Sequence, residues 1–239
     1  MTRLLYQTDS YIQHFPAIVT VVDIENHGVE LDQTAFYPGG GGQPADGGML
    51  TCNDRIYLVQ RARKVGENVL HVIEEDQPLP ELGSEVQGQI DWERRYMLMR
   101  THTAMHILCG VIFRDYGASV TGGDMDPLAG RMDFEFETMQ KELVRTIETA
   151  INQEVVNARS VRVDILPRDV AFQIPDLIRT KINLLPEGIL KVRVVEIEGL
   201  DLQADGGTHV KNTAEVGRIR VVDYKSKGKI NKRIYVALD

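Results

Sequence analysis

The 239-residue sequence lacks the features that mark secreted, membrane-bound or disulfide-stabilised proteins. Its two cysteines, Cys52 and Cys109, are too few for a disulfide framework and do not form a Cys-x-x-Cys pair. No apolar run approaches the length of a membrane span, and the first residues lack the apolar core of a signal peptide. We therefore expect a cytoplasmic protein without a membrane partner.

Positive charge is scarce in the first part of the chain. Residues 1–90 contain 5 Lys and Arg against 13 Asp and Glu, whereas residues 91–239 contain 22 of each. The second part is therefore free to carry local basic surfaces, and the densest basic strip covers residues 223–233. Such a strip would bind phosphates without reading base sequence. A solvated basic hairpin is the alternative.

Hydrophobic periodicity changes near residue 90. Before it, short β-rich stretches alternate with Gly, Pro, Asn and Asp, which predicts a small antiparallel β-barrel. The Pro-rich segment 77–84 is the expected connection between domains. The expected strands cover residues 17–24, 28–31, 55–59 and 68–73.

After residue 90 the pattern becomes helical. Asp91 is the expected N-cap of a helix through about residue 115, and Thr138 the N-cap of a second helix. Pro175 should interrupt a shorter helical stretch over residues 168–179. The expected strands here cover residues 131–136, 161–166 and 191–197. The whole pattern predicts an α+β two-domain protein, with a β-barrel over 1–88 and helices packed on an antiparallel sheet over 89–239.

Three histidines form the strongest chemical motif. His102 and His106 lie four residues apart on the predicted helix, so both imidazoles share one face and can point at one ion. A third, His209, ends the sequence Asp205-Gly206-Gly207-Thr208-His209. Three nitrogen ligands suffice for a hydrolytic zinc centre with an open fourth position. The helical pair by itself fits a structural role equally well.

Four consecutive glycines, Gly39 to Gly42, form the second motif. They permit positive φ angles and a close approach of a ligand, and their N–H groups could hold a phosphate or a carbonyl oxygen. No Gly-Lys-Ser/Thr follows, so the segment is not a Walker loop. Alone, a glycine run indicates a flexible loop more readily than a binding site.

Together, four blocks carry a resemblance to a known family. They are residues 34–46, residues 91–95, residues 99–106 and residues 199–213. In this order and context they resemble the free-standing alanyl-tRNA editing proteins (the AlaX group), which are related to the editing domain of alanyl-tRNA synthetase. The glycine-rich first domain resembles the medium-length members.

The resemblance implies an activity and a partner. The expected reaction is ATP-independent hydrolysis of the ester that joins a wrong amino acid to tRNA(Ala), serine first and glycine second. The physical need is clear, because a synthetase pocket cannot strongly reject an amino acid that only adds a hydroxyl or drops a methyl. The chain leaves no room for an aminoacylation domain, so we expect it to act on tRNA charged elsewhere, with no obligate protein partner.

The resemblance also assigns residues by position. It implies that His102, His106 and His209 are ligands of Zn²⁺, and that Thr34 and Gln43 lie near the aminoacyl group, where a hydroxyl and an amide could read serine. The glycine loop, with Gly40, Gly41 and Gly42, would pack against the substrate or the zinc domain.

Basic residues are the candidates for phosphate contact. Arg94, Arg95 and Arg100 lie next to the histidine pair, and Lys225 and Lys227 lie in the basic strip. Ion pairing within the helix is the competing interpretation of the arginines.

The fourth metal position is open at this stage. The family pattern commonly has cysteine where this chain has Asp205, and a carboxylate oxygen is also a zinc ligand. Asp205 is expected either as a ligand or as the partner of a bound water, and Cys109 is the weaker substitute. The metal would activate water or only orient the substrate, with Asp46 and Asp205 as candidate bases and a turn-forming role as the alternative for Asp46.

Two other functions compete with the editing enzyme. One is a non-catalytic tRNA-binding module that kept the fold, and the other is an unrelated metal-dependent esterase. Metal content and turnover distinguish these alternatives.

Overall fold

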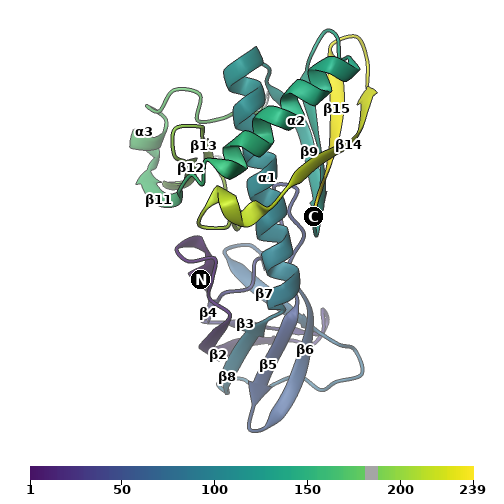
Figure 1. Cartoon of the computed structure of the whole chain (residues 1–239). Coiled ribbons are helices and arrows are strands. Elements are labelled where there is room, and N and C mark those ends of the chain that lie inside the picture. Colours follow the sequence, from purple (N-terminus) through teal and green to yellow (C-terminus); the bar gives the residue numbers. More distant parts are fainter. Residues whose placement is uncertain (181–187) are drawn as a thin grey trace. The chain divides into compact units, whose positions relative to one another are not determined.

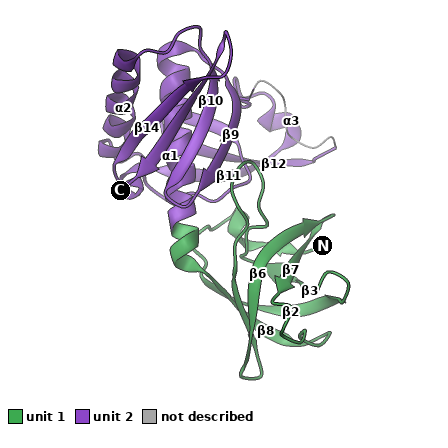
Figure 2. Ribbon diagram, turned by 90° about the vertical axis from the view of Figure 1, so that its right-hand side faces the viewer, with its two compact units in different colours: residues 1–96 green, residues 97–239 purple. Residues whose placement is uncertain are grey.

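The computed structural model describes residues 1–180 and 188–239, which divide into two compact units, residues 1–96 and 97–239 (Figures 1 and 2). The long helix α1 (Trp92–Tyr116) contributes to both, since the division follows Tyr96. Asp91 caps this helix as predicted, because its Oδ1 accepts a hydrogen bond from the Arg94 amide at 3.2 Å. No helix in the described ranges is long and apolar enough to cross a membrane.

Unit 1 is built on a closed antiparallel barrel with the strand order β2-β3-β7-β6-β5-β8. The predicted α+β class with an N-terminal β-barrel is therefore confirmed. Strand β8 follows the Pro-rich segment and pairs with both β2 and β5, so this segment lies inside unit 1. The elements of unit 1 are β1 (Arg3–Leu4), η1 (Leu5–Gln7), β2 (His14–Asp23), β3 (Gly28–Leu31), β4 (Gln33–Thr34), β5 (Gly48–Cys52), β6 (Arg55–Val65), β7 (Asn68–Ile73) and β8 (Glu85–Ile90).

Alternation along the strands fills the barrel. In β8 every second residue is buried, and β2 alternates in the same way over most of its length. The inward side chains form one apolar core that includes Phe15, Leu31, Phe36 and Leu50. This is the pattern expected of strands with one face toward the core and one toward water.

Unit 2 contains two antiparallel sheets, with the strand orders β14-β15-β10-β9 and β11-β12-β13. Helix α2 packs on β14, and Met105 of α1 lies against Gly130 of β10 (Figure 2). The remaining elements are β9 (Val120–Asp126), β10 (Ala129–Glu135), α2 (Lys141–Val156), β11 (Val161–Pro167), α3 (Arg168–Ala171), β12 (Lys191–Ile197), β13 (Asp201–Ala204), η2 (Thr213–Val216), β14 (Ile219–Ser226) and β15 (Asn231–Leu238).

Two helix predictions in unit 2 need correction. Gln140, not Thr138, precedes the first residue of α2, and no side chain caps that end. The helical stretch expected over 168–179 shrinks to α3, which ends at Ala171, well before Pro175. A four-residue helix has no room for the amphipathic repeat on which helix prediction depends.

One histidine, His71 on β7, is completely buried in unit 1. Its Nδ1 donates to the Val29 carbonyl at 3.1 Å, so its Nε2 accepts from the Thr34 hydroxyl at 2.8 Å. Burial lowers the pKa of His71 from 6.5 to about 4, although the hydrogen bond to Val29 opposes this. The neutral ring is therefore part of the native packing.

His71 predicts an acid-sensitive unit 1. The pKa of His71 is lower in the folded protein than in the unfolded chain. The contribution of the neutral ring to the free energy of unfolding is therefore complete above pH 6.5 and is lost as the pH falls toward about 4. The shift corresponds to about 3 kcal/mol of unfolding free energy. Urea unfolding followed by the fluorescence of Trp92, with a chelator present, should show this loss in the wild type. His71→Gln should reduce this pH dependence by the share that belongs to His71, and the exposed-site control His14→Gln should keep all of it. Equal slopes in wild type and His71→Gln would contradict the assignment.

Candidate metal centre

Four side chains of unit 2 meet at one point. They are His102 and His106 of α1, Asp205 and His209, and their candidate ligand atoms all lie within 4.8 Å of one another. The ring centroids are 5.1 Å apart for His102 and His106, and 4.2 Å apart for His102 and His209. The structure thus brings together the four residues that the sequence nominated as metal ligands.

Local sequence explains how the group is positioned. Along α1 the residues from Thr101 to Ile112 are all buried, so the histidine face points into unit 2. Gly110 allows the 200–201 turn to approach, since a Cβ there would lie 2.9 Å from the Leu200 side chain. The second pair of candidate ligands, Asp205 and His209, lies on a tight turn in which the Gly207 amide donates to Asp205 Oδ2 at 2.8 Å.

Each imidazole has a partner on the side away from the group. His106 Nδ1 donates to Asp201 Oδ2 at 3.0 Å, and His209 Nδ1 lies 3.1 Å from the Thr103 hydroxyl. The backbone of Thr208 hydrogen-bonds to His102. Because a carboxylate can only accept, His106 carries its proton on Nδ1 and leaves Nε2 as a free donor atom for a metal.

Electrostatics keep His102, His209 and Asp205 in their ligating forms near neutral pH. Burial lowers the pKa of His102 to about 4 and, with His102 beside it, holds the pKa of His209 well below its usual range. Burial acts against ionised Asp205, but the neighbouring histidines hold its pKa well below the ordinary value. At His106 burial is outweighed by the Asp201 hydrogen bond, which raises its pKa. Neutral imidazole and ionised carboxylate are the forms that bind divalent metals.

Asp205 is held from two directions. Its Oδ2 lies 3.0 Å from His209 Nε2 and 3.6 Å from Arg193 Nη1, and its Oδ1 lies 3.5 Å from His102 Nε2. Cys109 is not in the group: its buried thiol accepts a hydrogen bond from Gln203 at 3.3 Å, and burial raises its pKa. A protonated thiol is a poor metal ligand.

Sequence reasoning missed Asp201. This carboxylate is almost fully buried, accepts from Gln203 Nε2 at 2.7 Å and pairs with Arg179 at 3.5 Å, while orienting His106. The Arg179 guanidinium in turn stacks 3.6 Å from the centroid of Phe113. Asp201 lies in the block 199–213 that carries the family resemblance, but no spacing rule links it to the histidine pair.

The glycine loop belongs to unit 1 and is clamped at both ends. All four glycines have positive φ, from 57° to 131°, which non-glycine residues rarely adopt. Gly40 and Gln43 exchange backbone hydrogen bonds of 3.0 and 2.9 Å across the loop. Asp46, buried beyond it, accepts from the Tyr37 amide at 2.6 Å and pairs with Arg95. These contacts give Asp46 a structural role.

The buried position of Arg95 overturns one expectation. Its guanidinium is fully buried, pairs with Asp46 and donates to the carbonyls of Ser10 at 3.1 Å and Ala35 at 2.7 Å. It therefore cannot meet a phosphate. The partners of Arg95 lie far from it in the sequence. The alternative interpretation, an ion pair within the helix, is therefore also wrong for Arg95.

Thr34 and Gln43 are both buried in unit 1. The Thr34 hydroxyl donates to His71 and accepts from the Phe36 amide at 3.1 Å, which leaves it one lone pair. Any further contact of this hydroxyl would have to be as an acceptor.

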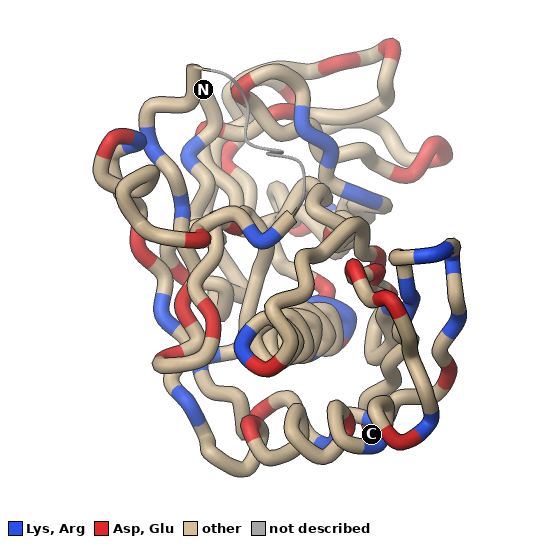
Figure 3. The backbone as a smooth tube through the Cα atoms, turned by 90° about the horizontal axis from the view of Figure 1, so that it is seen from above, with Lys and Arg blue, Asp and Glu red and all other residues tan. Residues whose placement is uncertain are grey.

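The predicted phosphate contacts occupy ordinary surface and packing positions. Arg100 donates to the carbonyls of Val216 at 2.9 Å and Asp239 at 2.5 Å. Lys225 pairs with Asp223 at 3.1 Å, and Lys227 is exposed. Figure 3 shows basic and acidic positions interspersed along the backbone.

Comparison with known proteins connects this geometry to a family. The model described as "Threonyl and Alanyl tRNA synthetase second additional domain" matches residues 192–235, and the one described as "tRNA synthetases class II (A)" matches residues 8–94. The fold and the buried histidine group thus define a protein related to tRNA synthetases.

Full-length relatives narrow this class. The chain is 41% identical to the alanyl-tRNA editing protein AlaX-M of Saccharolobus solfataricus over 98% of both chains. It is 36% identical to AlaX-M of Methanosarcina mazei over 100% of this chain and 97% of that protein. The alanine–tRNA ligase of Pyrococcus abyssi is 38% identical over 92% of this chain but only 24% of the ligase. The chain belongs to the AlaX-M family of alanyl-tRNA editing proteins, which are aminoacyl-tRNA hydrolases.

The Asp201–His106 contact predicts a role for Asp201 in metal affinity. Asp201→Asn keeps the size of the side chain but removes the charge that orients and polarises His106, so metal affinity should fall by about ten-fold or more. Chelator competition on the purified variant measures this. Asp164→Asn, an exposed substitution on β11, is the matched control. An unchanged affinity in folded Asp201→Asn would rule out the positioning role.

Proposed function

We propose that this protein is a trans-editing hydrolase that deacylates mischarged tRNA(Ala), acting first on the seryl and second on the glycyl ester. The observation that carries the proposal is the buried group of three histidines and one aspartate in a chain of the AlaX-M family. The reaction is an ester hydrolysis: water adds to the carbonyl carbon, the bond to the ribose oxygen breaks, and the free amino acid and the tRNA hydroxyl leave.

The donor set fits Zn²⁺, which we propose as the cofactor. Three imidazole nitrogens and a carboxylate oxygen are zinc ligands, and the hydrogen-bonded outer nitrogens are the usual support of such ligands. When bound, zinc with an open coordination position lowers the pKa of a bound water to about 7 and so supplies a nucleophile at neutral pH.

The chain's own residues prepare this centre. Asp201, Thr103 and the Thr208 backbone fix the three rings so that their candidate ligand nitrogens converge. We propose that Asp205 Oδ1, which faces His102, is the fourth protein donor and leaves one further position to water, while Oδ2 stays anchored by the Gly207 amide. Burial keeps His102 and His209 neutral, so at these two rings no proton competes with the metal near pH 7.

Several residues keep predicted roles in substrate binding. Thr34 and Gln43 are proposed to read the amino-acid side chain, with the one remaining lone pair of Thr34 as acceptor for a serine hydroxyl. The amides of Gly40, Gly41 and Gly42, and the cations Arg100, Lys225 and Lys227, are proposed contacts to the RNA. We also propose that the reaction needs no ATP and takes place in the cytoplasm.

Removal of one ligand tests the function. The zinc-loaded wild type should deacylate seryl-tRNA(Ala) and, more slowly, glycyl-tRNA(Ala), and spare alanyl-tRNA(Ala). His102→Ala should reduce the rate by about 100-fold or more. Loss of a residue that only supports a metal ligand costs about 10- to 100-fold, and loss of the ligand itself should cost at least as much. Gln87→Ala, at an exposed position of β8, should leave the rate unchanged.

Two outcomes would decide against this proposal. Deacylation that continues both in the presence of a chelator and in His102→Ala would show that the metal centre takes no part in the reaction. Binding of tRNA(Ala) without deacylation of either ester would favour the non-catalytic module.

The identity of the fourth donor predicts metal selectivity. Asp205→Cys replaces a hard oxygen with a soft thiolate, so the preference for Zn²⁺ over Mn²⁺ should rise by about ten-fold or more. Asp205→Asn keeps the shape of the side chain without its charge and should weaken the binding of both ions. Chelator competition with each metal measures these changes, and identical selectivity in wild type and Asp205→Cys would show that residue 205 is not a ligand.

A further inference from the structure

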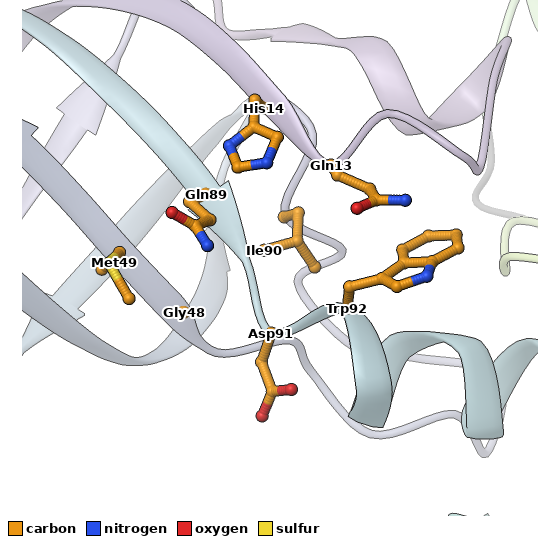
Figure 4. Close-up of a pocket in the computed structure, with 8 residues that line it drawn as sticks. All are labelled: Gln13, His14, Gly48, Met49, Gln89, Ile90, Asp91 and Trp92. Atoms are coloured by element: carbon orange, nitrogen blue, oxygen red, sulfur yellow. The ribbon is translucent and has the colours of Figure 1, made fainter.

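A cavity of about 420 Å³ lies at the start of α1, within unit 1. Its volume is in the range of pockets that bind small molecules. Figure 4 shows the carboxamides of Gln13 and Gln89 and the indole of Trp92 around Ile90, with the carboxylate of Asp91 pointing away from them. Asp91 is engaged at the helix end, where it caps α1.

Trp92 is the only tryptophan of the chain and is half-exposed. Its ring packs 5.6 Å from the centroid of Tyr96 and 5.6 Å from that of Tyr11, and both of these rings are half-exposed too. Aromatic rings that remain accessible beside a cavity are the platforms on which unpaired bases stack in RNA-binding proteins.

The polar groups around the ring are neutral and able to bind a ligand. Within the described residues, neither the Gln13 nor the Gln89 carboxamide hydrogen-bonds to another side chain or to the backbone. Each carboxamide offers both donors and an acceptor, which matches the mixed edge of a base. A purely apolar occupant would bury these amides without hydrogen-bond partners, which would cost binding free energy.

Charge argues against a phosphate as the occupant. All lining residues belong to the described range 1–180, and none of them is Lys or Arg. Residues 1–90 as a whole carry 13 acidic and 5 basic side chains. A site that holds phosphate needs cations or a row of backbone amides. A pocket that is lined by one carboxylate, Asp91, and by no Lys or Arg instead selects the uncharged part of a nucleotide.

We infer that this cavity binds an unpaired nucleobase, which stacks on Trp92 and hydrogen-bonds to the carboxamides of Gln13 and Gln89. The inference rests on the proposed function, since the tRNA substrate would supply the base. It adds a base-reading contact in unit 1 to an enzyme whose proposed metal centre lies in unit 2.

The sole tryptophan allows a direct test on the whole protein. Adenosine, guanosine, cytidine and uridine carry no phosphate, so their titration against Trp92 fluorescence isolates base binding. At least one should quench it saturably, with a dissociation constant on the order of a millimolar. Ribose should have no effect. Gln13→Ala and Gln89→Ala should each weaken binding by about five-fold, the effect of one lost hydrogen bond.

Gln87→Ala is the matched control, because Gln87 is exposed on β8, two residues from Gln89, and does not line the cavity. Non-saturating quenching by all four nucleosides, or equal binding in wild type, Gln13→Ala and Gln89→Ala, overturns the inference. Failure of the two proposals can be distinguished. Deacylation without nucleoside binding would rule out only the base-binding pocket. Nucleoside binding without deacylation would rule out only the proposed hydrolase activity.

Discussion

Unit 2 depends on burying four polar side chains around one point. A buried polar group without a partner costs about 1–3 kcal/mol, so three imidazoles and a carboxylate can be buried only if the surrounding chain satisfies them. It does so through contacts of long sequence separation: His106 to Asp201 spans 95 residues, and Thr103 to His209 spans 106. The same contacts tie α1 to the 201–209 segment, so the packing of this unit and the geometry of its site have one cause.

The part of this arrangement that sequence could predict is the part governed by local periodicity. His102 and His106 had to share a helix face because the helical repeat is close to four residues, and the barrel followed from alternation along short strands. Asp205 and His209 entered through a family motif, not through spacing. Asp201, Arg193 and Arg179 were out of reach because their partners are set by the tertiary fold. The Thr138 cap failed because α2 begins at Lys141 without any side-chain cap, so its start carries no cap signal. The helix over 168–179 failed because the four residues of α3 are too few to show a helical repeat.

Charge was the least predictable property, for the same reason. Arg95 sits in a basic run beside the histidine pair, yet it is fully buried with Asp46 as its partner. In the basic strip, Lys232 is buried against the carbonyls of Gly228 and Lys229, and Arg233 pairs with Asp133 at 2.6 Å. An unpaired buried charge is so costly that each of these cations has found an anion or a carbonyl. Counting charges along the sequence therefore overstates the cations that remain available to RNA.

The fourth donor shows how a ligand substitution is constrained by its surroundings. Asp205 ionises because three imidazoles surround it, and its Oδ2 is held by the Gly207 amide and lies near Arg193. A guanidinium 3.6 Å away withdraws electron density from the carboxylate and makes it a weaker metal donor than an isolated aspartate. In the metal centre that we propose, the three imidazoles would therefore supply most of the affinity for the ion. Each imidazole has its own hydrogen-bonded support, whereas Asp205 is shared with a cation.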